Sequence, residues 1–375
     1  MTRIVYITDA FAFWGGMERV LADKINVLTG QYGWDVTLLT INQGTHPLTY
    51  QLLPNVRHID LGVRMHQQYQ YNRVRKIFKR KELKYLLKKR LQSTLEIIRP
   101  DVIVCVKLDF VSVLSEVKGE TPLVVESHTL CKSEQMDDIG LLRRMYVWSL
   151  KRSIRKVDAV VALTEGDAVD WRMINNRVYS IPNMVHLNES GSYTSCEQKA
   201  VIYVGRFSRQ KDIDSLLRIW EYVYHKNPDW RLDIYGEGEL KEHYVEKIRS
   251  LSTNIYVYEP TADIMDRYRD YSILLLTSFY EPFGLVLPEA MSCGLPVVAF
   301  DCPYGPADII TNGVDGFLIK SRDIHAFADR VCQLIEDEDL RRRMGQNGIV
   351  SSQRFRADII MPRWINLFEK LLSSQ

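Results

Sequence analysis

Residues 273–299 read ILLLTSFYEPFGLVLPEAMSCGLPVVA and contain one complete unit of the fold. The unbroken apolar run at residues 273–276 predicts a buried strand, and the polar loop after it leads into a helix that ends near Gly294. A second apolar strand is expected at residues 296–299. A strand, a helix and a second strand in this order form the crossover unit of a parallel sheet, whose strands are short and apolar because helices cover both faces.

The same alternation extends along the whole chain. Seven such apolar runs precede the middle of the chain, at residues 4–8, 36–41, 56–61, 102–106, 123–125, 159–163 and 178–181. Besides the two strands quoted above, four runs follow it, at residues 200–204, 231–235, 255–257 and 316–319. Two such series predict an α/β protein with two Rossmann-like domains. Because ligands bind at the carboxyl ends of parallel strands, we expect a ligand cleft between the domains.

A change of composition marks the boundary between the two series. Residues 186–198 are rich in Asn, Ser, Gly and Glu and have no apolar period, which predicts a linker. The N-terminal domain is then expected at residues 1–185 and the C-terminal domain at residues 199–357. Residues 358–375 carry apolar side chains at helical spacing and predict a C-terminal helix.

The composition is that of a soluble globular protein. Hydrophobic residues make up 46% of the chain and charged residues 26%. No apolar run approaches the roughly 20 residues that span a bilayer. The six cysteines are scattered without a C-x-x-C pair, so neither a zinc cluster nor a disulfide framework is expected. These observations predict a cytoplasmic protein.

Positive charge is concentrated in one segment. Residues 64–99 contain twelve Lys and Arg and two Glu, a local charge of +10, whereas the whole chain has a net charge of +2. Within it, residues 71–95 interleave cations with apolar or aromatic side chains, among them Ile77, Phe78, Tyr85, Leu86, Leu87 and Leu91. This pattern predicts a helix on an anionic membrane surface, and the alternative is an ordinary solvated helix face. Nucleic acid is not an expected partner.

Two loops carry features that suit an anionic ligand. Residues 14–18 read WGGME, and paired glycines at a helix start let a ligand approach free N–H groups, although such a loop can also be empty. Arg206 and Lys211 follow the strand at residues 200–204 and can hold a diphosphate without a metal, or else be solvated cations. Asp212 and Asp214 match a metal-binding D-x-D only formally, because their place at a helix start predicts an N-cap and a first-turn carboxylate.

Two further segments place polar groups after strands. Residues 235–238 read YGEG, and a G-x-G here is weak evidence for close approach of the backbone to a base or ribose. In residues 281–289, EPFGLVLPE, Glu281 lies just outside the predicted helix and Glu289 within it. The two carboxylates should therefore contact different parts of one ligand. The N–H groups at residues 283–286 again face anionic or hydroxyl oxygens.

Taken together, these segments resemble retaining glycosyltransferase family 4. Glu281 and Glu289 look like its E-x7-E motif, and the glycine, Arg206–Lys211 and YGEG segments occur in the family's order. Residues 312–318, NGVDGFL, match a late family segment. The resemblance implies the GT-B fold, with a donor cleft between the domains and the C-terminal helix crossing back to the first. Residues 300–306 resemble bacterial members that build surface polysaccharides on lipid carriers.

The resemblance also implies roles for individual residues. Arg206 and Lys211 would hold the donor diphosphate, Glu289 the ribose hydroxyls and Glu281 the hydroxyls of the donor sugar. His128 resembles the family histidine over that sugar. The implied catalytic residues are Glu281, His128, Arg206 and Lys211. The implied donor-binding residues are Gly15, Gly16, Arg206, Lys211, Gly236, Phe283, Gly284, Leu285, Val286 and Glu289.

The function implied is transfer of a hexose or N-acetylhexosamine with retention, giving an α-linkage in cell-surface polysaccharide. The donor would be a UDP-sugar, or a GDP-sugar, and the acceptor a glycan or a polyprenyl-diphosphate-linked glycan. Neither a metal nor a cofactor is expected, and the enzyme would be cytoplasmic or peripheral on the inner face of the plasma membrane. The alternatives are a nucleotide-sugar epimerase of similar architecture, which needs acid and base carboxylates at the sugar, and a non-catalytic nucleotide-sugar binding protein.

Overall fold

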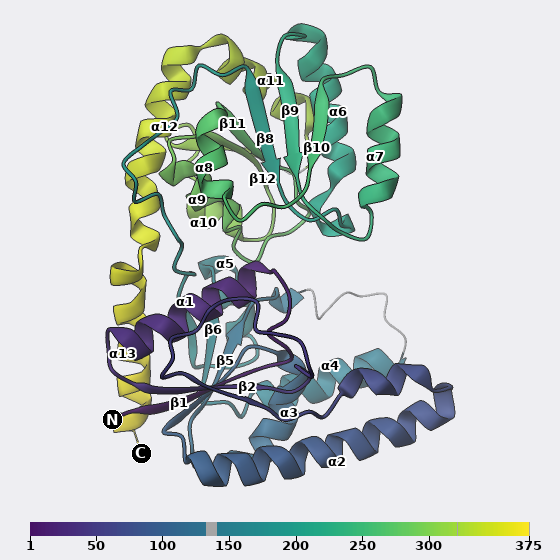
Figure 1. The fold of residues 1–375 in the computed structure, drawn as a ribbon, viewed down its shortest axis with the longest axis vertical. Coiled ribbons are helices and arrows are strands. Elements are labelled where there is room, and N and C mark those ends of the chain that lie inside the picture. Colours follow the sequence, from purple (N-terminus) through teal and green to yellow (C-terminus); the bar gives the residue numbers. More distant parts are fainter. Residues whose placement is uncertain (133–140, 321, 375) are drawn as a thin grey trace. The chain divides into compact units, whose positions relative to one another are not determined.

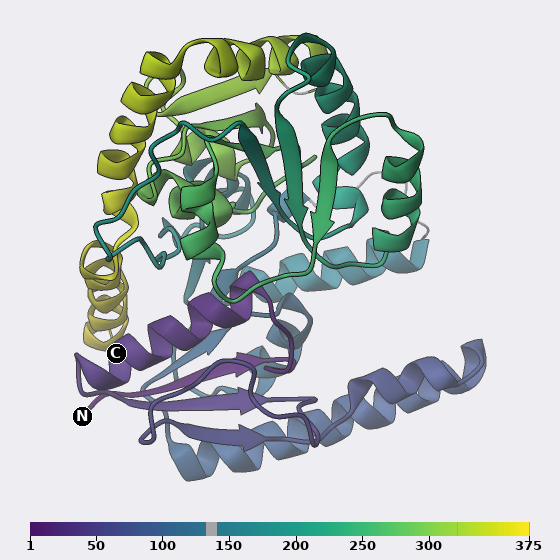
Figure 2. The same ribbon diagram turned by 45° about the horizontal axis from the view of Figure 1, so that its top comes forward.

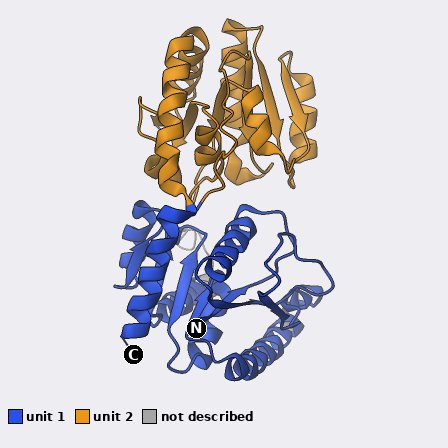
Figure 3. Cartoon of the chain, turned by 60° about the vertical axis from the view of Figure 1, so that its left-hand side comes forward, with its two compact units in different colours: residues 1–184, 357–375 blue, residues 185–356 orange. Residues whose placement is uncertain are grey.

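The computed structural model describes residues 1–132, 141–320 and 322–374, and the chain forms two compact units (Figure 3). Unit 1 comprises Met1–Met184 and Ala357–Gln375, and unit 2 comprises Val185–Arg356. The chain changes unit next to the boundaries expected at residues 185 and 357.

Unit 1 is built on a seven-stranded parallel sheet with the strand order β3-β2-β1-β4-β5-β6-β7. Its strands are β1 (Arg3–Thr8), β2 (Asp35–Thr40), β3 (Arg57–Asp60), β4 (Val102–Cys105), β5 (Leu123–Ser127), β6 (Ala159–Ala162) and β7 (Val178–Ser180). All seven predicted strands are confirmed. The central strand β1 pairs with β2 and β4, so that Ile4 lies between Val36 and Val102.

Helices cover both faces of this sheet, as Figures 1 and 2 show. The helices are α1 (Gly16–Gly30), η1 (Met65–Gln70), α2 (Arg73–Ile98), α3 (Leu108–Val117), α4 (Leu141–Ile154), α5 (Glu165–Arg172) and α13 (Ala357–Ser373). Alternate residues of β1 point to opposite faces. Ile4 and Tyr6 pack in the core formed with α1 and α13, and Val5 and Ile7 pack in the core formed with α2 and α3.

Unit 2 is built on a six-stranded parallel sheet with the order β10-β9-β8-β11-β12-β13. The strands, all predicted from the sequence, are β8 (Ala200–Val204), β9 (Arg231–Tyr235), β10 (Ile255–Tyr258), β11 (Ile273–Leu276), β12 (Val297–Asp301) and β13 (Gly316–Lys320). The helices are η3 (Arg209–Lys211), α6 (Ile213–Lys226), α7 (Lys241–Ser250), α8 (Ile264–Arg267), η4 (Tyr268–Asp270), α9 (Val286–Ser292), α10 (Gly305–Ile309), α11 (Ile324–Glu336), α12 (Glu338–Ser352) and η5 (Gln353–Phe355).

The segment expected to be a linker, residues 186–198, packs on unit 2. The Asn188 backbone N–H donates to Ser292 Oγ at 3.0 Å, and the Thr194 backbone N–H donates to the Cys293 carbonyl at 3.0 Å. The Cys196 side chain is buried. The backbone of the expected linker therefore forms hydrogen bonds with the rest of unit 2.

Helix α13 returns the end of the chain to unit 1. Its buried residues Trp364 and Phe368 complete the core that covers one face of the sheet. Within the described residues, no helix combines the length and the apolar character needed to cross a membrane.

Candidate functional site

The loops after β8 and β11 bring Lys211 and Glu281 together. Lys211 Nζ donates to Glu281 Oε1, and Ser278 Oγ donates to the same oxygen at 2.7 Å. The side chains of Lys211 and Glu281 are 17% and 6% exposed. The sequence assigned these two residues to separate parts of the donor, and the structure joins them in one largely buried ion pair.

Hydrogen bonds to backbone carbonyls hold the two loops to each other. The Phe279 N–H donates to the Gln210 carbonyl at 2.8 Å, and Gln210 Nε2 donates to the Tyr280 carbonyl at 2.9 Å. The Lys211 carbonyl accepts from Thr277 Oγ1 at 3.0 Å. The position of the ion pair is therefore fixed by the backbone as well as by its own charges.

The segment from Glu281 to Gly284 is clamped on its other side by the loop after β12. The Glu281 N–H donates to the Pro303 carbonyl at 2.7 Å, and its carbonyl accepts from the Gly305 N–H at 2.9 Å. A Cβ on Gly305 would overlap the backbone carbonyl of Phe283. Gly284 has a φ of 93°, a conformation that costs little only for glycine.

Arg206 and the YGEG segment form a second part of the site. The Phe207 N–H donates to the Glu237 carbonyl at 2.9 Å, and a Cβ on Gly236 would overlap the Gly205 carbonyl oxygen. A glycine is thus needed at position 236 so that two loops of the protein can pack. The sequence had instead predicted that a base or ribose approaches the backbone there. Arg206 is exposed, and its side-chain stem lies beside Gly238.

The other predicted donor residues of unit 2 lie around the start of α9. Glu289 is 2% exposed in the first turn of this helix, and Phe283 is buried. Leu285 is the N-cap residue and Val286 the first helical residue. The contact of these groups with a donor stays a prediction.

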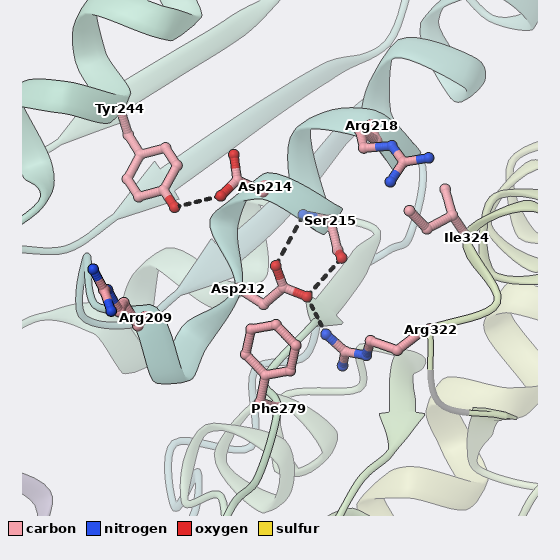
Figure 4. A pocket seen from close by; sticks show the side chains of 9 residues that line it. All are labelled: Arg209, Asp212, Asp214, Ser215, Arg218, Tyr244, Phe279, Arg322 and Ile324. Atoms are coloured by element: carbon pink, nitrogen blue, oxygen red, sulfur yellow. Dashed lines mark hydrogen bonds and ion pairs between the residues drawn. The ribbon is translucent and has the colours of Figure 1, made fainter. Parts of the chain in front are cut away.

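Asp212 has the structural role predicted from its sequence context. Its side chain accepts from the Ser215 N–H at 3.2 Å as the N-cap of α6, and it also pairs with Arg322 (Figure 4). Asp214 accepts from Tyr244 OH at 2.8 Å. Both carboxylates of the D-x-D thus have protein partners. In the described part of the chain, no cluster of three or more His, Cys, Asp or Glu suits a metal ion.

Arg322 is a residue that the sequence analysis missed. Its Nη2 donates to the Thr277 and Ser278 carbonyls at 3.1 and 2.9 Å, and its guanidinium lies 4.4 Å from the centroid of the Phe279 ring. It therefore supports the loop that carries Glu281. Nothing near Arg322 in the sequence signals this role, because its partners precede it by more than forty residues.

In unit 1, Gly15 is the N-cap residue of α1 and Gly16 its first residue. The Gly15 carbonyl accepts from Tyr50 OH at 3.2 Å. Trp14, which the sequence analysis assigned no role, is 76% exposed and packs edge-on against Tyr50 with ring centroids 5.1 Å apart. An exposed tryptophan ring thus stands next to the paired glycines.

His128 lies beside a buried carboxylate that sequence reasoning also missed. His128 Nε2 is 3.1 Å from Glu126 Oε1, and the same oxygen accepts from Lys24, which is itself buried. Lys24 Nζ lies 3.9 Å from the centroid of the Trp364 ring. Burial alone would raise the pKa of Glu126, but Lys24 and His128 outweigh it and lower this pKa to about 2. Glu126 is therefore an anion, and it fixes the surroundings of His128.

The basic segment at residues 71–95 lies mostly on α2. Leu87 and Leu91, two of the apolar residues expected to face a membrane, are buried with Leu83 in the core of unit 1. Their spacing of four residues places them on the inner stripe of the helix. Among the side chains of the segment that the structure describes, the large apolar or aromatic ones that remain exposed are Tyr71, Ile77, Phe78 and Tyr85.

Two family models match the chain one after the other. The Glycosyl transferase 4-like domain matches residues 15–177, and the Glycosyl transferases group 1 model matches residues 191–350. The chain belongs to the GT4-like glycosyltransferases. The first match ends and the second begins on either side of the boundary between the two units. Of the functions considered from the sequence, the matches support a glycosyltransferase over an epimerase or a non-catalytic binding protein.

Individual relatives agree with this assignment. The glycosyltransferase is 26% identical to the amylovoran biosynthesis glycosyltransferase AmsD of Erwinia amylovora over 97% of this chain and 99% of that protein. It is 29% identical to the poly(ribitol-phosphate) alpha-N-acetylglucosaminyltransferase of Staphylococcus aureus (strain COL) over 63% of this chain and 48% of that protein. A mutant of S. aureus TarM, solved with Fondaparinux, alpha-GlcNAc-glycerol and UDP, shares the GT-B fold. It has a TM-score of 0.78 and 16% identity over 98% of this chain and 100% of that one.

Proposed function

We propose that the enzyme transfers a hexose or N-acetylhexosamine from a UDP-sugar to a glycan acceptor in surface polysaccharide synthesis, with retention and an α-linkage. The observation that carries the proposal is the largely buried pair of Lys211 and Glu281 at the carboxyl ends of β8 and β11. A fixed cation beside a fixed carboxylate suits a ligand that is anionic at one end and rich in hydroxyls at the other, as a sugar diphosphate is.

The relatives support the details of this proposal. The S. aureus relative is named an alpha-N-acetylglucosaminyltransferase, and the TarM structure contains UDP. The Erwinia relative acts in amylovoran biosynthesis, according to its name. We therefore infer a UDP-linked donor, an α-linkage and a polysaccharide product, which agree with the names of these relatives.

In the proposed reaction, the bond between the anomeric carbon and the β-phosphate oxygen breaks, and the diphosphate keeps the electron pair. The acceptor hydroxyl forms the new bond on the same face of the sugar and gives its proton to the leaving phosphate oxygen. Lys211 and Arg206 stabilise the charge that develops on the diphosphate, without a metal ion. In this proposal Glu281 binds hydroxyls of the sugar and Glu289 binds the ribose. His128, which lies beside Glu126, acts at the sugar, as the family resemblance implies.

Thermal unfolding in the presence of a chelator tests the donor site. A panel of UDP-sugars and GDP-sugars is added to the wild type, to Glu289→Ala and to the matched control Glu246→Ala, whose side chain is exposed on α7. At a donor concentration of 100 times Kd, we expect a stabilisation of about 2.7 kcal/mol in the wild type and the control. Glu289→Ala should need much more donor for the same shift.

The opposite results are equally clear. If no donor stabilises the protein, or if one does so only after manganese is added, the cations of unit 2 do not hold a diphosphate by themselves. NMR of the product made from the stabilising donor then gives the anomeric configuration, and a β-product would reject retention.

We also propose that α2 binds an anionic membrane surface near a lipid-linked acceptor. Exposed cations such as Arg75 and Arg80 alternate on this helix with the exposed Ile77 and Phe78. Such a helix gains binding energy both from the charge of the lipid headgroups and from shallow burial of its apolar side chains.

A further inference from the structure

One face of the sheet in unit 2 is polar near its edge strand β10. In β9, Leu232 and Ile234 point into the core, whereas Arg231, Asp233 and Tyr235 alternate with them and point to the opposite face. Parallel sheets normally bury apolar side chains on both faces. A strand with this sequence therefore faces something other than a hydrophobic core on its second side.

The neighbouring strand continues the same surface. The register pairs Tyr256 with Asp233 and Tyr258 with Tyr235, so the two tyrosines of β10 share the face of the polar residues of β9. A pocket of about 650 Å³ lies here, and its lining includes Gln198, Arg231, Asp233, Tyr235, Tyr258 and Tyr271. We call it the tyrosine pocket. Its volume is in the range of small-molecule sites.

The buried carboxylate of Asp233 has an unused acceptor. Asp233 is 2% exposed, and its Oδ2 accepts from Arg231 Nε at 3.1 Å and from Tyr271 OH at 2.8 Å. Its Oδ1 has no hydrogen-bond partner among the residues that the structure describes. Buried carboxylate oxygens are rarely left without a donor, because the lost hydration is costly. A ligand donor would satisfy this oxygen once the carboxylate turns towards the pocket that Asp233 lines.

The tyrosines supply ring surface and further polar groups. The Tyr235 and Tyr258 rings are stacked, with centroids 4.9 Å apart and an angle of 18° between their planes. Tyr258 is 41% exposed, and the hydroxyls of Tyr235 and Tyr271 lie 3.1 Å apart. The stack holds the partly exposed Tyr258 ring at the mouth of the pocket in a fixed orientation.

We infer that the tyrosine pocket binds a pyranose unit of a saccharide, at a site additional to the donor site. A pyranose offers a ring face of C–H groups to the tyrosines and several hydroxyl donors that suit the carboxylate of Asp233. The lining carries both cations, such as Arg231, and carboxylates, such as Asp233 and Asp270, so it does not favour an anionic ligand. Such a site would retain a glycan chain on the enzyme. The inference goes beyond the proposed transfer reaction, since binding here needs no donor.

Saturation-transfer NMR tests this site directly. The probes are the methyl glycosides of glucose, galactose, mannose, rhamnose and N-acetylglucosamine, without any nucleotide. The proteins are the full-length wild type, Asp233→Asn, Tyr258→Ala, and the control Tyr193→Ala, whose exposed tyrosine belongs to unit 2 but not to the pocket lining. Unfolding temperatures establish that each variant is folded.

We expect at least one glycoside to bind the wild type and the control. Its affinity should fall about tenfold or more in Asp233→Asn and Tyr258→Ala, the effect of losing one hydrogen bond to a charged group or one ring contact. Binding should persist in Glu281→Gln, which separates this site from the donor site. The inference would be overturned if no glycoside binds, or if the pocket variants bind as well as the wild type. It would also be overturned if binding is lost in Glu281→Gln or if uridine displaces the glycoside. A failed donor titration with intact glycoside binding would reject only the transfer proposal.

Discussion

At the scale of single residues, glycines shape the loop that carries Glu281. Gly305 lies so close to the Phe283 carbonyl that a side chain would overlap it. Gly313 has a φ of 78°, but nothing lies near the position of its Cβ. Gly305 is needed because no side chain fits beside the Phe283 carbonyl, and Gly313 is needed because of its positive φ. This difference makes the two positions a matched pair for substitution.

We expect Gly305→Ala to raise the Kd for the donor by about tenfold or more. A displaced Phe283 carbonyl shifts the loop that carries Glu281, and losing one hydrogen bond to a charged group costs roughly 1.5–3 kcal/mol. Gly313→Ala should cost roughly 1–2 kcal/mol of stability through its strained φ and leave the donor Kd unchanged. Isothermal titration with the donor and chemical denaturation measure the two effects. An unchanged Kd in Gly305→Ala would mean that the loop position does not matter for the donor.

At the scale of elements, one ion pair joins three parts of unit 1. Lys24 on α1 contacts both Glu126 on β5 and the ring of Trp364 on α13. Both charged side chains are 1% exposed. Removing one partner of such a pair leaves a buried charge, whereas removing both leaves only a change of shape.

Lys24→Ala should therefore lower the free energy of unfolding by about 3–5 kcal/mol. The double variant Lys24→Met, Glu126→Leu should recover most of this loss, because no unpaired charge remains. Denaturant unfolding of the two variants measures the difference. If the double variant were as unstable as Lys24→Ala, packing rather than charge would explain the effect.

The pair also predicts how stability depends on pH. Interaction with Lys24 and His128 outweighs burial and lowers the pKa of Glu126 from 4.5 to about 2 in the folded chain. The stabilisation is thus complete above pH 4.5, the ordinary value, and is lost as the pH falls towards 2. In Glu126→Gln, the slope of unfolding free energy against pH should be smaller in this window. An unchanged slope would show that Glu126 does not contribute to acid unfolding.

At the scale of the whole molecule, the charge is distributed unevenly. A segment with a local charge of +10 belongs to a chain of net charge +2, and α2 presents much of it to solvent. The buried leucines of α2 attach it to unit 1, so its cations and exposed aromatic side chains form a fixed surface.

This surface predicts salt-dependent binding to anionic liposomes. Replacing Arg75 and Arg80 by Gln should weaken binding about 30-fold at low salt, at roughly 1 kcal/mol for each cation. Replacing the exposed Arg249 and Arg343 of unit 2 should have little effect. Liposome flotation at increasing salt measures the affinity, which should fall as screening increases. Binding that is absent, or insensitive to salt, would contradict a membrane role for α2.

The sequence by itself determined the strands and the positions of the site loops. Apolar runs such as residues 273–276 are local signals, because a strand buried on both faces must be apolar along its length. The N-cap role of Asp212 is equally local, since its partner Ser215 is three residues away. Glu281 and Glu289 were found because the residues between them form one recognisable segment.

Only the tertiary structure decided which distant residues meet. Lys211 and Glu281 are 70 residues apart, Lys24 and Glu126 are 102 apart, and Arg322 and Asp212 are 110 apart. Residues 231–235 were expected as one more apolar strand, and only the register with β10 and the contact of Tyr271 with Asp233 showed that the polar residues of β9 line a pocket. The physical reason is that hydrophobic periodicity reports the burial of each segment, whereas the pairing of buried charges depends on strand order and packing between segments.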